Sequence, residues 1–344
     1  MKRKVVQGSL VLCALLLLAG SLLAGCAPSD GDADVYEVRL SSQMPVDHHI
    51  TEALDLFCER AEELSDGQLE FHHYPAGQLL TDAEVPEAIA GGTVEMAQTY
   101  LPWWEGIVPN LNLSGGVFLD DLEHYKRINA GPYGDYQAGL LKGNASCQVI
   151  TSMLYTSEAG YILTQPVYEP GDADGMKIRT PSAAASADIQ AMGGVPTVMS
   201  SADVYMALQR GTIEGALSGL TSFYARKWYE VAKNVLIWDV NITDFPLVAS
   251  LDWWNGLPED LQQAILDAGE EASAYAEDAC LASEAAVETA LEAEGVEIYR
   301  VPQEDRDEVW QPLVAPARHQ AAVDEHGEEL VSQYETWVEE AREE

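Results

Sequence analysis

The sequence predicts an α/β fold with two lobes, each built on a mainly parallel sheet flanked by helices. Strand-like runs alternate with helical patterns in two stretches, 35–97 and 176–217, and such alternation is typical of parallel sheets. The 344 residues are enough for two hydrophobic cores. A helical pattern from Pro258 to Glu294 spans about 36 residues, or ~54 Å, which exceeds the width of one lobe.

The first residues have the pattern of a lipoprotein export signal. Basic residues 2–4 precede an apolar run from Leu10 to Leu18 and the sequence Leu23-Ala24-Gly25-Cys26. We therefore expect residues 1–25 to be a signal peptide and Cys26 to carry a lipid, with an uncleaved anchor as the alternative. Residues 26–34 are small and acidic, as in a flexible tether.

Residues 35–156, joined by 245–284, are expected to form the first lobe. Asp47 is placed to cap its first helix, and Asp66-Gly67 to end it. The elements expected in order are a strand at 35–41, a helix from Asp47 to Ser65, a strand at 68–74, a helix from Thr81 or Asp82 to Ala90, a strand at 93–97, helical sequence after Asp120 broken near Gly131-Pro132, and a strand at 148–155.

Residues 157–244, with a contribution from 285–344, are expected to form the second lobe. Ser182 is placed to cap a helix after Pro181. The elements expected are strands at 161–163 and 176–179, a helix at 182–192, a strand at 195–198, a helix at 201–210 and a strand at 213–217; a strand at 245–251 then returns to the first lobe, the long helix follows, and a last strand lies at 296–301.

The charge balance excludes one class of partner. The chain has 57 Asp and Glu against 18 Lys and Arg, a formal net charge of −39. Such acidity argues against nucleic-acid binding, which needs basic surfaces. It fits a halophilic source, because molar salt shortens the Debye length to ~3 Å and screens the self-repulsion.

Arg179 is the main candidate for a ligand-binding residue. It ends a short strand, and the following Thr180-Pro181-Ser182 leads into a helix start. A guanidinium offers a planar fork that matches a carboxylate, and the carboxyl ends of strands are common ligand sites. A surface ion pair with one of the many acids is the alternative role.

The sequence resembles the periplasmic solute-binding subunits of TRAP transporters, the DctP-like family. The resemblance is carried by GMKIR, GGVPTVMSSADVYMALQRGTIEGA and KWYEVAK in 175–233, and by YPAGQLLTDAEVPEAIAGGTVEMA and WWNGLPEDLQQAI outside that range. It implies a two-lobe periplasmic binding protein-like fold with a long helix bracing both lobes. It also implies that Arg179 binds the carboxylate of a small organic acid and that a sodium-driven membrane permease receives the ligand. No ATP, metal or other cofactor is implied.

The resemblance also points to polar residues around Arg179. Ser218 stands where relatives often have an asparagine, and it has a turn hydroxyl as its alternative role. Tyr161 stands near the place of a second arginine in many relatives; a single arginine suggests one bound carboxylate, and packing in the hinge is the alternative for Tyr161. Asn241 and the nearby Asp239 lie in a stretch where relatives often have polar cleft residues, and His48 lies in another stretch where relatives contact ligand. A satisfied or exposed histidine is the alternative for His48.

Aromatic residues are candidates for the body of the ligand. Tyr100 and Trp103 follow the strand at 93–97, where rings can stack on an apolar or sugar-like group. Phe223 and Trp228 are weaker candidates, because KWYEV reads as structural sequence. Ordinary packing is the alternative for all four.

No pattern of a metal site or catalytic site is present in the sequence. Cys58, Cys147 and Cys280 are far apart and without metal-type spacing, so buried free thiols are expected, although one disulfide stays open. His72 and His73 alternate along a strand and cannot hold one metal together.

The sequence therefore predicts a non-enzymatic, lipid-anchored extracytoplasmic binding protein that closes on one small organic acid. Three alternatives stay open: an ABC-type solute-binding protein, a ligand sensor, and a secreted lipoprotein hydrolase. The long helix and the KIR motif speak against the first, and no nucleophile–base spacing supports the last.

Overall fold

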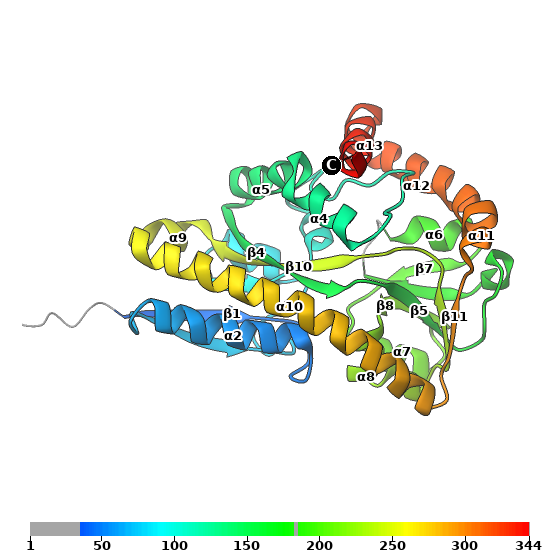
Figure 1. The fold of residues 1–344 in the computed structure, drawn as a ribbon, viewed down its shortest axis with the longest axis horizontal. Coiled ribbons are helices and arrows are strands. Elements are labelled where there is room, and N and C mark those ends of the chain that lie inside the picture. Colours follow the sequence, from blue (N-terminus) through cyan, green and yellow to red (C-terminus); the bar gives the residue numbers. More distant parts are fainter. Residues whose placement is uncertain (1–34, 182–184, 344) are drawn as a thin grey trace, which may run out of the picture. The chain divides into compact units, whose positions relative to one another are not determined.

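The computed structural model describes residues 35–181 and 185–343, and the chain from Tyr36 onward forms one compact unit. This unit contains two sheets (Figure 1). The first sheet has five strands in the order β2-β1-β3-β10-β4, and the second has six in the order β11-β9-β5-β8-β6-β7. The expected signal peptide, tether and Cys26, and the proposed cap Ser182, lie outside the described residues.

The first sheet combines parallel and antiparallel pairs. β1 pairs in parallel with β2 and β3, whereas β10 runs antiparallel to β3 and β4. The strands are β1 (Tyr36–Ser41), β2 (Leu69–Tyr74), β3 (Met96–Gln98), β4 (Cys147–Thr156) and β10 (Thr243–Ser250).

The second sheet is mixed in the same way. β5 is antiparallel to β8 and β9, and the other pairs are parallel. The strands are β5 (Ala159–Leu163), β6 (Lys177–Thr180), β7 (Val195–Val198), β8 (Gly215–Gly219), β9 (Asn234–Ile237) and β11 (Glu297–Arg300). The two-sheet α/β architecture is thus as expected, with antiparallel pairing where the chain passes between the sheets.

Helices cover both sheets, and their apolar faces make the cores. In α2, residues Ile50, Leu54, Phe57 and Ala61 are fully buried at helical spacing. The helices are α2 (His49–Leu64), α3 (Val85–Ala90), α4 (Leu122–Ala130), α5 (Pro132–Ala145), α6 (Ser186–Ala191), α7 (Val204–Gln209), α8 (Leu220–Ala225), α9 (Leu251–Gly256), α10 (Glu259–Ala293), α11 (Gln303–Asp305), α12 (Gln311–His326) and α13 (Glu328–Glu343), with single turns η1 (Leu101–Trp104), η2 (Pro170–Ala173), η3 (Trp228–Glu230) and η4 (Arg306–Trp310).

The long helix α10 packs along both sheets (Figure 1). Its first half lies against α2 and β4, and its second half lies against α8. Its buried face is rich in small residues, and Gly269 lies so close to β4 that an added Cβ would be 3.3 Å from Ile150 and Thr151. The expected bracing helix is therefore present.

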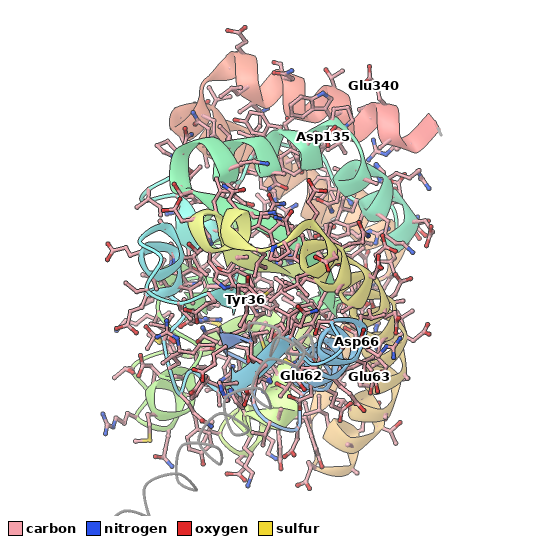
Figure 2. All side chains as sticks on the ribbon, turned by 90° about the vertical axis from the view of Figure 1, so that its left-hand side faces the viewer. Tyr36, Glu62, Glu63, Asp66, Asp135 and Glu340 are labelled. Carbon is pink, nitrogen blue, oxygen red and sulfur yellow. The ribbon has the colours of Figure 1, made fainter. Side chains whose placement is uncertain are left out.

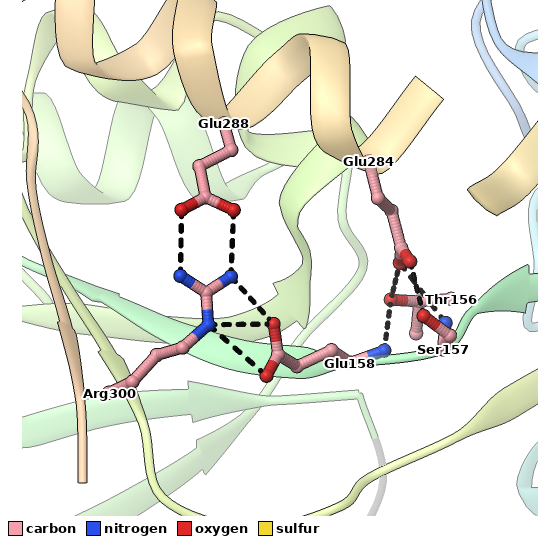
Figure 3. A network of polar contacts seen from close by, with 6 residues as sticks. All are labelled: Thr156, Ser157, Glu158, Glu284, Glu288 and Arg300. Carbon is pink, nitrogen blue, oxygen red and sulfur yellow. Dashed lines mark hydrogen bonds and ion pairs between the residues drawn. The ribbon is translucent and has the colours of Figure 1, made fainter. Parts of the chain in front are cut away.

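A polar network fixes the turn between β4 and β5 to α10 (Figure 3). The Glu284 carboxylate accepts hydrogen bonds from the Thr156 hydroxyl at 2.6 Å, the Ser157 amide at 3.0 Å and the Ser157 hydroxyl. Arg300 then joins Glu158 of this turn to Glu288 of α10. The segment that links the two sheets is thus held by the helix that spans them.

Local predictions failed at several element ends. The N-cap of α2 is His48 rather than Asp47, and its Nδ1 accepts from the Ile50 amide at 3.2 Å. α3 begins at Val85 rather than at Thr81 or Asp82, and Thr81 donates from its amide and hydroxyl to the Glu84 carboxylate. Strand β9 was not expected; it is a short buried run whose apolar residues alone do not distinguish strand from helix.

Acidic side chains lie on the outer surface of the helices. Figure 2 labels Glu63 and Asp66 at the end of α2, Asp135 on α5 and Glu340 on α13, all of them exposed. Among the described residues, no helix combines the length and apolar character that a membrane span requires.

Candidate functional site

A cavity of about 120 Å³ lies between the two sheets. Strand ends of both sheets contribute to it, which agrees with the expected location of a ligand site. Its lining residues are Gln43, Met44, Asp82, Tyr100, Trp103, Tyr155, Ala159, Arg179, Pro181, Ala185, Ser201, Leu217, Ser218, Gly219, Ser222, Arg226, Asn241, Thr243 and Phe245.

Arg179 lies in this cavity and is only 3% exposed. Its Nε donates to the Met199 carbonyl at 2.9 Å and its Nη1 to the Leu217 carbonyl at 3.0 Å. Burial lowers the pKa of the guanidinium to about 10, so it stays charged at neutral pH. Among the described residues, no carboxylate oxygen lies within the 4.0 Å ion-pair limit of Arg179. The structure therefore holds a buried cation oriented by carbonyls rather than neutralised by an acid.

Ser218 lies near the end of β8 and lines the same cavity. Its hydroxyl lies 2.7 Å from the Tyr155 hydroxyl. Tyr155 also donates to Ser222 at 2.7 Å and accepts from the Gly219 amide at 3.3 Å. Tyr155 and Ser222 were not predicted; their only sequence signal is their position near the ends of β4 and β8.

Aromatic rings form one wall of the cavity. Tyr100 and Trp103 both line it, as expected from their place after β3. Tyr100 and Tyr155 each meet the ring of Phe245 edge-on, at centroid distances of 5.4 and 4.7 Å. This wall offers ring surface to the body of a ligand.

Arg226 is a second guanidinium in the cavity, and the sequence analysis missed it. It follows α8, and its Nη2 donates to the Gln43 carbonyl at 3.0 Å. Its Nε is buried without a partner among the described residues. Burial lowers the pKa of Arg226. The scarcity of cations in this chain was the one available signal, because 18 Lys and Arg stand against 57 acids.

Besides the bonds of Tyr155, further hydrogen bonds at the cavity join segments of the two sheets. Besides the bond from Arg226 to Gln43, the Ser200 hydroxyl donates to Asp82 at 2.9 Å. His48 Nε2 lies 3.2 Å from the Thr221 hydroxyl. Because His48 Nδ1 accepts the capping bond of α2, its proton is on Nε2, which donates to Thr221. His48 thus supports the closed arrangement from outside the cavity lining.

Two predicted residues lie in cores instead. The alternation of β5 directs Tyr161 into the core that contains Trp238 and Trp310, so its ring does not line the cavity. Phe223 is fully buried and packs against Trp228 at 5.9 Å. For both, the packing alternative describes the structure.

Asn241 lines the cavity and also a neighbouring one of about 310 Å³. In the neighbouring cavity Arg318 donates to both oxygens of Asp188 at 2.6 Å and to Asp239 at 3.0 Å. Asp239 is therefore held by a cation, and we assign the Arg318 cluster (Arg318, Asp188 and Asp239) to structure rather than ligand binding.

No chemistry for metal binding or thiol catalysis is assembled in the described part of the chain. It contains no cluster of three metal-type ligands. Cys58, Cys147 and Cys280 are free thiols, and burial raises the pKa of each. His73 is occupied by Ser42 and Asp55, away from His72.

Comparisons with known proteins give the family. Residues 40–323 match the family model of the bacterial extracellular solute-binding proteins, family 7 (DctP). The C4-dicarboxylate-binding periplasmic protein DctP of Rhodobacter capsulatus is 26% identical over 280 residues, covering 77% of this chain and 80% of the relative. A solute-binding protein of Sulfitobacter sp. strain NAS-14.1 is 30% identical over 245 residues, covering 69% and 73%.

A solved structure confirms the fold. The TRAP periplasmic solute-binding protein from Sulfitobacter sp. NAS-14.1 with bound β-D-galacturonate superimposes with a TM-score of 0.80 at 20% identity, covering 90% of this chain and all of that one. The two-lobe fold and the long helix thus agree. The chain belongs to the bacterial extracellular solute-binding proteins of family 7, the DctP family.

Proposed function

We propose that this protein captures a small organic acid in the cavity between its sheets, with the carboxylate on Arg179 and a further hydrogen bond from Ser218. The single observation that carries the proposal is the buried guanidinium of Arg179, which has no acidic partner among the described residues. An unpaired buried charge is costly unless a ligand neutralises it.

The names of the relatives support an acid as the ligand. One relative is named for C4-dicarboxylates, and the solved neighbour holds galacturonate. Both ligands contain a carboxylate, which a guanidinium can bind through two parallel hydrogen bonds. The rings of Tyr100 and Trp103 line the same cavity and would contact the ligand's carbon skeleton.

A thermal-shift screen of the signal-free protein with small organic acids tests this proposal. An acid at 100 times its dissociation constant should add ~2.7 kcal/mol to the free energy of unfolding. Arg179→Ala should abolish the shift. Arg60→Ala is the matched control, because it removes an arginine that pairs with Glu271 on the outer surface. An equal shift in Arg179→Ala and wild type contradicts the site.

Delivery and location extend the proposal. By analogy with its family, the loaded protein would deliver the acid to a TRAP-type membrane permease, and Cys26 would tether it outside the cytoplasm. Metabolic labelling with a radioactive fatty acid should mark the wild type and not Cys26→Ala. Equal labelling of both proteins contradicts the anchor.

The acidic composition supports a halophilic setting. With a net charge of −39, self-repulsion is strong in dilute buffer and screened in molar salt. We expect the melting temperature to rise by several degrees between 0.05 and ~2 M potassium chloride. A melting temperature independent of salt would refute this part of the proposal.

A further inference from the structure

The ligand cavity contains two guanidinium groups, although a single one was expected from the sequence. Arg179 comes from β6 of the second sheet, and Arg226 follows α8 on the same side of the cavity. Neither forms an ion pair within 4.0 Å among the described residues. The chain has 57 acidic residues, yet none of the described ones pairs with either arginine of this cavity.

The ionised groups around the cavity do not cancel. Asp82 is the one Asp or Glu among the lining residues that the structure describes, and its Oδ1 accepts from Ser200. Two guanidinium groups and one carboxylate leave one positive charge. An occupant with one negative charge makes the closed site neutral, whereas a dianion leaves one negative charge buried.

Arg226 has donors left for a ligand. Its Nη2 is used by the Gln43 carbonyl, but its Nε has no partner and its Nη1 has no hydrogen bond among the described residues. Gln43 follows β1 of the first sheet. A ligand oxygen on Arg226 would therefore bind a group that already spans both sheets.

Resting on the proposed function, we infer that Arg226 is a second ligand-binding residue, which selects acids carrying a hydroxyl or carbonyl oxygen besides the single carboxylate on Arg179. The uncharged oxygen would accept a hydrogen bond from Nε or Nη1 of Arg226. The negative charge of the carboxylate would neutralise the net positive charge of the cavity. A plain monocarboxylate leaves these donors unsatisfied, which is costly in a closed cavity. A dicarboxylate satisfies them but adds a second negative charge.

The same contact favours closure. A ligand stabilises the closed form only through interactions that the open form lacks. Since the bond from Arg226 to Gln43 exists when the two sheets' segments meet, an oxygen bound to Arg226 strengthens an interaction of the closed form. Arg226 thus links ligand identity to closure.

Isothermal titration with three four-carbon acids tests the inference: butyrate, 2-hydroxybutyrate and succinate. Wild type should bind 2-hydroxybutyrate at least about tenfold more tightly than butyrate, as expected for one hydrogen bond to a charged donor, and more tightly than succinate. Arg226→Gln should bind the two monocarboxylates within about threefold of each other, and it should bind both more weakly than wild type does, because the variant also loses one positive charge.

Arg226→Lys is the second variant, which keeps the charge and removes the fork. It should retain only part of the preference for 2-hydroxybutyrate. Circular dichroism and melting curves of both variants show that a lost preference is not lost folding. An unchanged ratio in Arg226→Gln, or a wild type that prefers succinate, overturns the inference while the role of Arg179 stands. Binding of no acid overturns the proposed function itself.

Discussion

Two largely buried arginines, Arg179 and Arg318, lie in neighbouring cavities in opposite electrostatic settings. Arg318 donates to two carboxylates, and its guanidinium lies 4.8 and 5.3 Å from the rings of Phe118 and Trp238. Burial alone would lower its pKa, but Asp188 and Asp239 raise it above the usual value. Among the described residues, Arg179 donates to two carbonyls and pairs with no acid, and its pKa is lowered.

The contrast separates a cation paired with acids of the protein from one that, under the proposed function, binds the carboxylate of a ligand. Arg179 lies near the end of β6, whereas Arg318 lies within α12. What distinguishes them is the partner, which comes from 130 residues away for Arg318. A bound carboxylate would neutralise Arg179 and accept its hydrogen bonds, as Asp188 does for Arg318.

The largest effect is expected for Arg318→Met. The substitution leaves Asp188 and Asp239 without their cation, and breaking a buried pair costs about 3–5 kcal/mol. Urea unfolding at neutral pH measures the loss. The triple variant with Asp188→Asn and Asp239→Asn should recover part of it. A loss below about 1 kcal/mol would show that the Arg318 cluster is not structural.

Acidification should destabilise the protein through the buried His49, whose Nε2 lies 3.1 Å from the Leu154 carbonyl. Burial lowers the pKa of His49 to about 4, whereas the unfolded chain takes up the proton near pH 6.5. The unfolded state then binds more protons, so the free energy of unfolding falls as the pH drops from 6.5 towards 4, by up to about 3 kcal/mol.

His49→Gln isolates this contribution, because glutamine still has a donor for the Leu154 carbonyl. Glu105 acts in the opposite sense, since burial raises its pKa to about 7 and favours the folded state on acidification. Stability curves between pH 7 and 4 should therefore be less steep for the variant than for wild type. Parallel curves would exclude His49 as a cause.

A smaller effect is expected for Arg179→Lys. Lysine keeps the charge but loses the planar fork, so the affinity for an acid should fall roughly tenfold, or about 1.4 kcal/mol. The unliganded protein should unfold at nearly the wild-type urea concentration. Titration calorimetry and urea unfolding on the same sample separate the two quantities. A large loss of stability with unchanged affinity would make Arg179 equivalent to Arg318.

The smallest effect is expected for Arg300→Ala. Arg300 bonds to Glu158 and Glu288 (Figure 3), but it is 42% exposed. Exposed ion pairs contribute about 0–1 kcal/mol, since water and salt screen them. Urea unfolding should show a loss within this range, well below that of Arg318→Met. A loss above about 2 kcal/mol would mean that the β4–β5 turn depends on this pair.

Sequence reasoning could predict most of the fold and part of the site. Periodicity located nearly all strands and the long helix. Position at a strand end indicated Arg179, Tyr100 and Trp103, the family resemblance indicated Ser218 and Asn241, and all five line one cavity. It could not predict Arg226, because the direction of a side chain after a short helix depends on how that helix docks.

Errors at Tyr161 and His48 have a similar origin. The alternation of β5 gives two faces, but only the pairing with β8 and β9 decides which one meets the core. His48 was expected to reach the ligand, and instead its two nitrogens are used by the α2 cap and by Thr221. Thr221 is 173 residues away in the sequence, so no local pattern around His48 indicates this partner.

The unpaired cations of the cavity sit inside a protein with a net charge of −39. At long range the net negative charge of the protein repels an approaching anion, and the attraction of the two arginines acts only when the anion is close to the cavity. Encounter should therefore be slow in dilute buffer and quicken as ions screen the outer field, the reverse of ordinary electrostatic steering. The association rate for an anionic ligand would therefore be highest at molar salt concentration.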